Sequence, residues 1–316
     1  MLLGHDQPWR EWRKAMGGER MHHAWLLAGR RGVGKGSFAL AAARELIGAA
    51  PGEGGSHPDI ITLTYGPKDD KEERKRADGK PYEQARSIRI AQIRAMQARL
   101  GTRPTLGDKR AIIIDPADDL ERNAANALLK SLEEPPVGTY FVLVAHSPAR
   151  LLPTIRSRCR VLRFPTIADA EMDRLLRELS PGADDPTRAA AIAAAAGSPG
   201  AALQFVELEL GKVARAMTDI LDRGDPGFQL RGTLAGLIGA RPDRERIRAV
   251  LELARSVVAQ RLDGALADPR PIIDTHSELV RLTGEQPTYN FDAGLLAMEI
   301  GTLLARAAGA SERANG

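Results

Sequence analysis

Residues 24–47 read AWLLAGRRGVGKGSFALAAARELI, and this stretch decides the fold. The apolar run at 24–28 is typical of a buried strand, and residues 38–47 are typical of a helix. Residues 29–36 between them have the spacing Gly-x-x-x-x-Gly-Lys, in which backbone N–H groups surround a phosphate at the start of a helix. A simple glycine turn that joins strand to helix is the alternative. The full spacing with its lysine favours a phosphate-binding loop.

One position of this loop departs from the phosphate-loop pattern. Lys35 would reach the β and γ phosphates of a nucleotide, but the next position, where a Ser or Thr hydroxyl binds magnesium, is Gly36. We therefore expect that phosphate can bind and that magnesium is poorly placed. The candidate nucleotide-binding residues of the loop are Gly29, Gly32, Gly34, Lys35, Gly36 and Ser37.

A second apolar run, at residues 110–114, predicts another strand and ends at Asp115. Open α/β sheets place their sites at the carboxyl ends of strands, so Asp115 could hold magnesium in the same site. The next residue, which in a hydrolytic protein of this type would be a glutamate that activates water, is Pro116. Asp118 and Asp119 are predicted to cap the following helix. The strand end thus has a metal-type carboxylate and lacks a catalytic base.

Five further segments, at residues 23–27, 57–60, 88–94, 126–136 and 152–159, complete a pattern that resembles the clamp-loader subunits of the AAA+ class. Within that family the pattern is similar to the delta-prime subunits of bacterial DNA polymerase III. The segments NALLKSLEEPP (residues 126–136) and LPTIRSRC (residues 152–159) are the most specific. The resemblance covers roughly residues 1–205 and is weak beyond them.

The resemblance implies three parts, and the residue pattern agrees with them. Strand-like runs alternate with helical patterns over residues 1–165, which predicts an AAA+ α/β domain with a parallel sheet. Residues 166–206 are predicted to form a small helical lid, and residues 207–316 an all-α collar domain. Apolar residues recur at helical spacing over 247–262 and 296–304. Such apolar faces pack either in the core of a domain or at an interface between subunits, and the sequence alone does not distinguish these two possibilities.

The resemblance also implies a role for Arg158. In clamp loaders the arginine of the Ser-Arg-Cys segment projects across a subunit interface to the γ-phosphate of ATP in the neighbouring subunit. A guanidinium is always charged and is suited to phosphate, and a finger supplied in trans stabilises the transition state. The alternative is that Arg158 belongs to a solvated basic run, formed by Arg156, Arg158, Arg160 and Arg163.

Other departures from the family pattern predict that this chain does not turn over ATP by itself. The strand at 140–144 is followed by Ala145 and His146, where a Thr or Asn senses the γ-phosphate; His146 could stand in, or could be an ordinary loop residue. Residues 197–202 have alanine where the lid usually has an arginine. Binding of ATP and magnesium at this site is therefore expected to be weak. The family's zinc module is replaced by residues 48–56, which lack cysteine, so we expect no zinc.

The resemblance implies as partners the ATPase subunit gamma/tau, the delta subunit, the sliding clamp through the complex, and primed DNA indirectly. Lys130 is a candidate DNA phosphate contact or an ordinary surface lysine. An active ATPase subunit of the same machine is an alternative that Pro116 disfavours. A stand-alone phosphate-loop kinase is another, but no second cluster of polar substrate-binding residues is visible.

Composition sets the remaining limits. The chain has 316 residues, 43% hydrophobic, and a net charge of +4, which permits nucleic-acid contact without requiring it. Its one cysteine, Cys159, excludes a disulfide scaffold and suits a reducing cytoplasm. We expect no signal peptide and no membrane span. The charged run at 68–80 predicts a solvated, flexible loop, with a DNA-facing role as the alternative.

Overall fold

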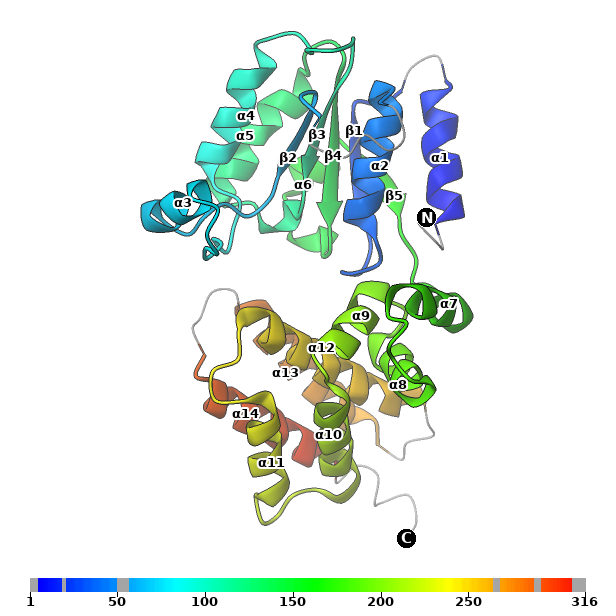
Figure 1. Cartoon of the computed structure of the whole chain (residues 1–316), viewed down its shortest axis with the longest axis vertical. Coiled ribbons are helices and arrows are strands. Elements are labelled where there is room, and N and C mark those ends of the chain that lie inside the picture. The colour runs from blue at the N-terminus through cyan, green and yellow to red at the C-terminus, as the bar shows by residue number, and fades with distance from the viewer. Residues whose placement is uncertain (1–4, 19–20, 50–56, 264–267, 287–290, 309–316) are drawn as a thin grey trace. The chain divides into compact units, whose positions relative to one another are not determined.

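The computed structural model describes residues 5–18, 21–49, 57–263, 268–286 and 291–308 of the chain. Two compact units are present, Met1–Thr166 and Ile167–Gly316. The first combines helices with a sheet and the second is helical (Figure 1). The predicted fold class, an α/β domain with a parallel sheet followed by a helical region, is therefore confirmed. The predicted division of the helical region into lid and collar stays a prediction.

A five-stranded parallel sheet forms the centre of the first unit, in the order β2-β3-β4-β1-β5. The strands are β1 (Ala24–Ala28), β2 (Ile60–Leu63), β3 (Arg110–Ile114), β4 (Thr139–Ala145) and β5 (Arg160–Arg163). Every residue of β1 and β3 is buried. Strands of a parallel sheet with both faces covered are continuously apolar, and this explains the two unbroken runs in the sequence.

Helices cover both faces of this sheet (Figure 1). On one face α1 (Asp6–Met16) and α2 (Lys35–Ile47) pack through Trp12 and Phe38. On the other face α4 (Ile90–Leu100) and α5 (Arg122–Glu133) pack through residues that include Ile93 and Leu128. Residues of one strand alternate between the two cores: Trp25 and Leu27 face α2, whereas Leu26 belongs to the opposite cluster.

The parallel register brings the residues that follow three strands to one edge of the sheet. Ala28 is aligned with Ala145 on β4 and with Arg163 on β5. Short elements follow β3 and β4 and lead the chain onward: η1 (Ala117–Asp119), η2 (Pro148–Arg150) and α6 (Pro153–Arg156). Residues that precede the strands lie at the opposite edge. The phosphate-type loop and Asp115 thus share the carboxyl edge, as predicted.

The prediction of a flexible loop over residues 68–80 is wrong for most of that segment. It contains the helix α3 (Asp70–Ala77), because Asp69 caps the helix N-terminus by accepting a hydrogen bond from the N–H of Glu72 at 3.0 Å. Glu72 is also paired with Lys75 at 2.7 Å, one turn further on. Acidic residues in the first turn and basic residues in the last turn complement the helix dipole.

A buried charged cluster joins the start of β2 to the start of β3. The Asp59 carboxylate, which is 1% exposed, accepts hydrogen bonds from the N–H groups of Thr105 at 2.6 Å and Leu106 at 2.8 Å. Arg110 Nη2 lies 3.9 Å from Asp59 Oδ1. Burial by itself raises the pKa of Asp59, but these hydrogen bonds and the charge of Arg110 bring it below its ordinary value. The Arg110 guanidinium also donates to the carbonyl oxygens of Arg99, Thr102 and Arg103.

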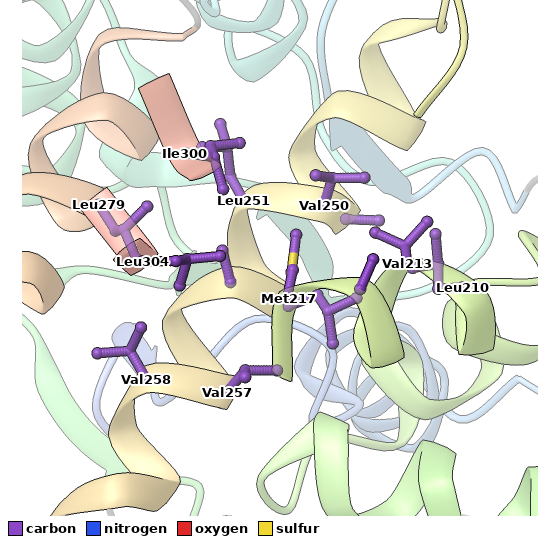
Figure 2. Close-up of a cluster of buried hydrophobic side chains, with 14 of the residues drawn as sticks. Leu210, Val213, Met217, Val250, Leu251, Val257, Val258, Leu279, Ile300 and Leu304 are labelled. Carbon is purple, nitrogen blue, oxygen red and sulfur yellow. The ribbon is translucent and has the colours of Figure 1, made fainter. Parts of the chain in front are cut away.

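The second unit is built from helices around one apolar core (Figure 2). Its elements are α7 (Asp169–Leu179), α8 (Asp185–Ala195), α9 (Pro199–Glu207), α10 (Gly211–Arg223), α11 (Gln229–Ile238), α12 (Arg244–Gln260), η3 (Arg261–Asp263), α13 (Arg270–Glu285) and α14 (Ala293–Ala308). The apolar face predicted over residues 247–262 is buried from Val250 to Val258. Leu262 lies beyond the end of α12 and is exposed, so that face ends earlier than predicted.

Another buried ion pair fixes the connection between α10 and α11. Asp225 accepts hydrogen bonds from the N–H groups of Leu230 and Arg231, and from Arg231 Nε at 3.0 Å. Arg231 in turn donates to Thr302 Oγ1 on α14, and its guanidinium lies 4.0 Å from the centre of the Phe228 ring. The pair therefore links α11 to α14 as well as closing the loop before it.

Candidate functional site

The loop after β1 has the backbone conformation of a phosphate cradle. Gly32 and Gly34 have φ values of 77° and 95°, in the left-handed region that glycine adopts without strain. Successive N–H groups in such a loop converge on a concave space that attracts anions. Because α2 begins at Lys35, directly after Gly34, its N-terminal N–H groups add to this attraction.

Gly29 is required at the first position of the loop by close packing. A Cβ atom at Gly29 would lie 2.5 Å from the carbonyl oxygen of Phe164, which follows β5. The Gly29 N–H donates to the carbonyl oxygen of Ala145 at the end of β4, at 3.4 Å. The loop is thus anchored to both strands that neighbour β1.

Lys35 is held inside the loop. Its side chain is buried, and Nζ donates to the carbonyl oxygens of Gly29 at 2.7 Å and Arg30 at 2.6 Å. Burial lowers the pKa of Lys35 to about 8, although the nearby carboxylates of Asp115 and Asp118 oppose this shift. The ammonium group therefore remains mostly protonated at neutral pH, which is the form that would attract a phosphate.

Asp115 lies against Gly36, the position that lacks the magnesium-binding hydroxyl. A Cβ atom at Gly36 would be only 2.5 Å from Asp115 Oδ2. Burial raises the pKa of Asp115, while the charges of Lys35 and Arg31 act in the opposite direction. The carboxylate thus lies against the first turn of α2, next to the position where a serine or threonine side chain would begin. The loop geometry fits a phosphate, whereas the magnesium ligand set is incomplete.

The prediction that Asp118 and Asp119 cap α5 is wrong. Asp118 accepts hydrogen bonds from the N–H groups of His146 and Ser147, the latter at 2.7 Å, and so ties η1 to the end of β4. Asp119 accepts a hydrogen bond from the Tyr65 hydroxyl. These residues are used as long-range anchors because η1 places them beside the sheet edge rather than at the helix start. His146 Nε2 lies 4.0 Å from Asp115 Oδ1, so the predicted sensor position lies next to the carboxylate of the candidate nucleotide site.

Arg158 lies at the other edge of the sheet from this site. It precedes β5 by two residues, and the register aligns Arg160 of β5 with Trp25 of β1. The phosphate-type loop follows β1 at its far end. Five residues of strand span about 16 Å, which is farther than an arginine side chain reaches. Arg158 therefore cannot contact a phosphate held by its own subunit's loop.

The Arg158 side chain is partly exposed and is held by nearby acceptors. Nη1 donates to the carbonyl oxygen of Thr154 at 2.9 Å and contacts Ser157 Oγ at 3.4 Å. Nη2 lies 2.5 Å from Glu133 Oε1, at the end of α5. The two most specific sequence segments are thus in direct contact.

Cys159, next to Arg158, has a packing role in this structure. Its side chain packs against the core beneath α5, and burial raises its thiol pKa to about 12. A thiol with so high a pKa is a poor nucleophile at neutral pH. The residue therefore packs the segment before β5 against this core.

The structure brings Gly29, Gly32, Gly34, Lys35, Gly36 and Asp115 together in one site. Ser37 lies in the first turn of α2 with an exposed side chain. Sequence reasoning missed Glu133 as the partner of Arg158, and the signal for it was the pair of acidic residues, Glu133 and Glu134, that precedes the two prolines at the end of the segment at 126–136. Lys130 on the same helix is exposed, and its predicted DNA contact stays a prediction.

Among the described residues, neither a metal-binding cluster nor a helix long and apolar enough to span a membrane is found. No group of three or more His, Cys, Asp or Glu side chains could hold a metal ion there; most of the segment predicted to lack zinc, residues 50–56, lies outside them. Over the same part of the chain, each helix is too short or too polar to span a lipid bilayer.

Comparison with known proteins gives matches over the α/β unit and beyond it. The sequence pattern of the family described as "DNA polymerase III, delta subunit" matches residues 4–168. The chain is 35% identical over 212 residues to the DNA polymerase III subunit delta' of Pseudomonas aeruginosa, covering 61% of this chain and 58% of that protein. It is 30% identical over 233 residues to the Escherichia coli subunit delta', covering 69% and 64%.

One further relative and one solved structure are also similar to this chain. The Bacillus subtilis subunit delta' is 36% identical over 174 residues, covering 51% of this chain and 47% of that protein. The matched region thus spans about half to two thirds of the length of these relatives. A gamma-subunit-related protein of Thermotoga maritima has a similar fold, with a TM-score of 0.50 at 17% identity, over 97% of this chain and 100% of that chain. Since the family pattern covers more than half of the chain, the chain belongs to the DNA polymerase III delta-subunit family, and the three relatives described above are delta-prime subunits.

Proposed function

We propose that this chain is a delta-prime-type subunit of a DNA polymerase III clamp loader that provides Arg158 to the ATP site of a neighbouring subunit. The loader would place a sliding clamp on primed DNA. The partners would be the gamma or tau ATPase subunit and the delta subunit. Relatives named delta' and relatives named tau/gamma both match this chain, which supports membership of such a complex.

The observation that carries the proposal is the position of Arg158 at the sheet edge opposite its own phosphate-type loop. The guanidinium is partly exposed and therefore accessible to another molecule. An arginine that cannot reach its own site, but can meet a phosphate from outside, is suited to act in trans. There it would stabilise the charge that develops as the γ-phosphoryl group leaves.

We further propose that the chain does not hydrolyse ATP at its own loop. Pro116, which follows Asp115, has no group that can accept a proton from water. Gly36 has no hydroxyl for magnesium, and the Asp115 carboxylate lies against it. Lys35 and the glycine backbone would still bind a nucleotide or phosphate weakly, through the N–H cradle and the ammonium charge.

The test of the trans role uses a clamp loader reconstituted with this chain, and it compares the wild type with Arg158→Ala. The matched control is Arg156→Ala, which removes an exposed arginine two residues away at the end of α6. Loss of an arginine finger lowers turnover at the site it serves by about 10³-fold or more, and other sites in the assembly dilute that loss. We expect DNA- and clamp-stimulated ATPase to fall clearly with Arg158→Ala and little with Arg156→Ala, while assembly is retained. Equal activities of the two variants would reject the proposal.

The test of the weak nucleotide site is a titration of the isolated chain with a fluorescent ATP analogue. Saturable binding that is lost in Lys35→Ala, together with no steady ATPase activity, is the expected result. Absence of a saturable signal would reject nucleotide binding at this loop. A measurable steady ATPase rate would instead favour an active ATPase subunit.

A further inference from the structure

Glu133 is the carboxylate partner of Arg158. It is the last residue of α5, and its Oε1 lies 2.5 Å from Arg158 Nη2. The other hydrogen bonds of the guanidinium go to Thr154 O and Ser157 Oγ, within its own segment. Glu133 is thus the only negatively charged group among the contacts described for this arginine, and it comes from a different element.

We propose that Glu133 holds Arg158 against its own subunit and competes for the guanidinium with the triphosphate of the neighbouring subunit. This inference rests on the proposed function of Arg158. The two groups would form a resting ion pair, and engagement of ATP next door would break it. The hydrogen bond from Arg158 to Thr154 O is formed within the segment that precedes β5. Arg158 can therefore keep this bond when its ion pair with Glu133 on α5 breaks.

The exposure of the pair makes such an exchange feasible. The Arg158 and Glu133 side chains are 35% and 47% exposed, so solvent screens their attraction. Exposed ion pairs alter an equilibrium by at most about fivefold. A triphosphate carries more charge than one carboxylate, and its oxygens accept the planar guanidinium in a bidentate manner. The phosphate therefore wins the competition when ATP is present, and Glu133 wins when it is absent.

Glu134 provides a matched control on the same helix end. It follows Glu133 directly, its side chain is exposed, and no ion pair to it occurs among the described residues. Removal of its charge changes the net charge of the surface by the same amount. A difference between Glu133→Gln and Glu134→Gln therefore reports the specific pair rather than the general electrostatic field.

The experiment measures the ATP concentration at half-maximal ATPase activity of the reconstituted loader. We expect Glu133→Gln to lower this concentration about two- to fivefold, and Glu134→Gln to leave it unchanged. Glu133→Asp retains the charge and should return the value toward that of the wild type. The effect of Glu133→Gln should vanish in an Arg158→Ala background, because the guanidinium for which Glu133 and the triphosphate compete is then missing. It should also shrink as salt rises, since salt screens the pair.

The outcomes separate this inference from the proposed function. If Arg158→Ala impairs the ATPase while Glu133→Gln matches Glu134→Gln, the competition is refuted and the trans role stands. If Glu133→Gln lowers activity as Arg158→Ala does, Glu133 orients the arginine for catalysis and the competition is again refuted. If Arg158→Ala has no effect, the proposed function itself fails. Urea denaturation of Glu133→Gln checks that the first unit is still folded.

Discussion

Replacement of Asp59 by alanine should destabilise the first unit by about 3 kcal/mol. The change removes the acceptor of two backbone hydrogen bonds, from Thr105 at 2.6 Å and Leu106 at 2.8 Å. It also leaves the Arg110 guanidinium, which is 4% exposed, without its carboxylate. Loss of one partner of a buried ion pair costs about 3–5 kcal/mol. We expect the lower end because Arg110 keeps its three carbonyl acceptors.

The tryptophans make this prediction easy to measure. The chain has three, Trp9, Trp12 and Trp25, and all lie in the first unit, so their fluorescence follows the unfolding of that unit. Urea denaturation of wild type and Asp59→Ala gives the difference in the free energy of unfolding. Asp108→Ala is the control, because Asp108 is exposed in the same segment; we expect it to stay within about 0.5 kcal/mol of the wild type.

The pH dependence provides a second check on the cause. The native pKa of Asp59 lies below its ordinary value of 3.8, so its ionised form stabilises the fold. This contribution is complete above the unfolded pKa and is lost as pH falls through the lower native pKa. The difference in the free energy of unfolding between wild type and Asp59→Ala should therefore be constant from about pH 8 to 5 and should become smaller below about pH 4. A gap under about 1 kcal/mol at pH 7, or one that does not narrow in acid, would refute the reasoning.

Two further predictions concern the loop and the helical unit. Because the pKa of Lys35 is about 8, its charge is lost as pH rises through that value; affinity for a fluorescent ATP analogue should fall between about pH 7 and 9.5, and an unchanged affinity would contradict the role of Lys35. Asp225→Ala should destabilise the second unit by about 3 kcal/mol by unpairing buried Arg231. Circular dichroism should detect this loss and tryptophan fluorescence should not, whereas a shift in both signals would contradict an effect confined to that unit.

The strands and the phosphate-type loop could be predicted because their signals are local. Residues 24–28 and 110–114 are continuously apolar since both faces of the sheet are covered. The glycines and Lys35 have a spacing set by the shape of a phosphate. Their proximity to Asp115 followed from the rule that parallel strands end at one edge. The insertion of β4 between β1 and β3 depends on long-range pairing, and no local pattern indicated it.

Other contacts could not be predicted, because they depend on how distant segments meet. Asp118 is of a residue type that commonly caps helices, yet its carboxylate accepts hydrogen bonds from the backbone N–H groups of His146 and Ser147 after β4. Glu133 meets Arg158 only because α5 and the segment before β5 end at the same place. Within the charged run at 68–80, residues Asp70–Ala77 form a helix because Asp69 caps its N-terminus and the order of its charges complements the helix dipole. The density of charge alone did not indicate this helix.

The opposite placement of Arg158 and the phosphate-type loop gives the α/β unit a direction. Subunits that provide an arginine at one edge of the sheet and receive a neighbour's arginine at the other edge associate head to tail. Each contact in such a series uses two different surfaces. A member that donates an arginine but has an incomplete acceptor site can serve a neighbour on one side only. On the proposed role, such a chain marks one end of a series of ATP sites. The order of the subunits, and not only their number, would then be encoded in which copies retain a working acceptor.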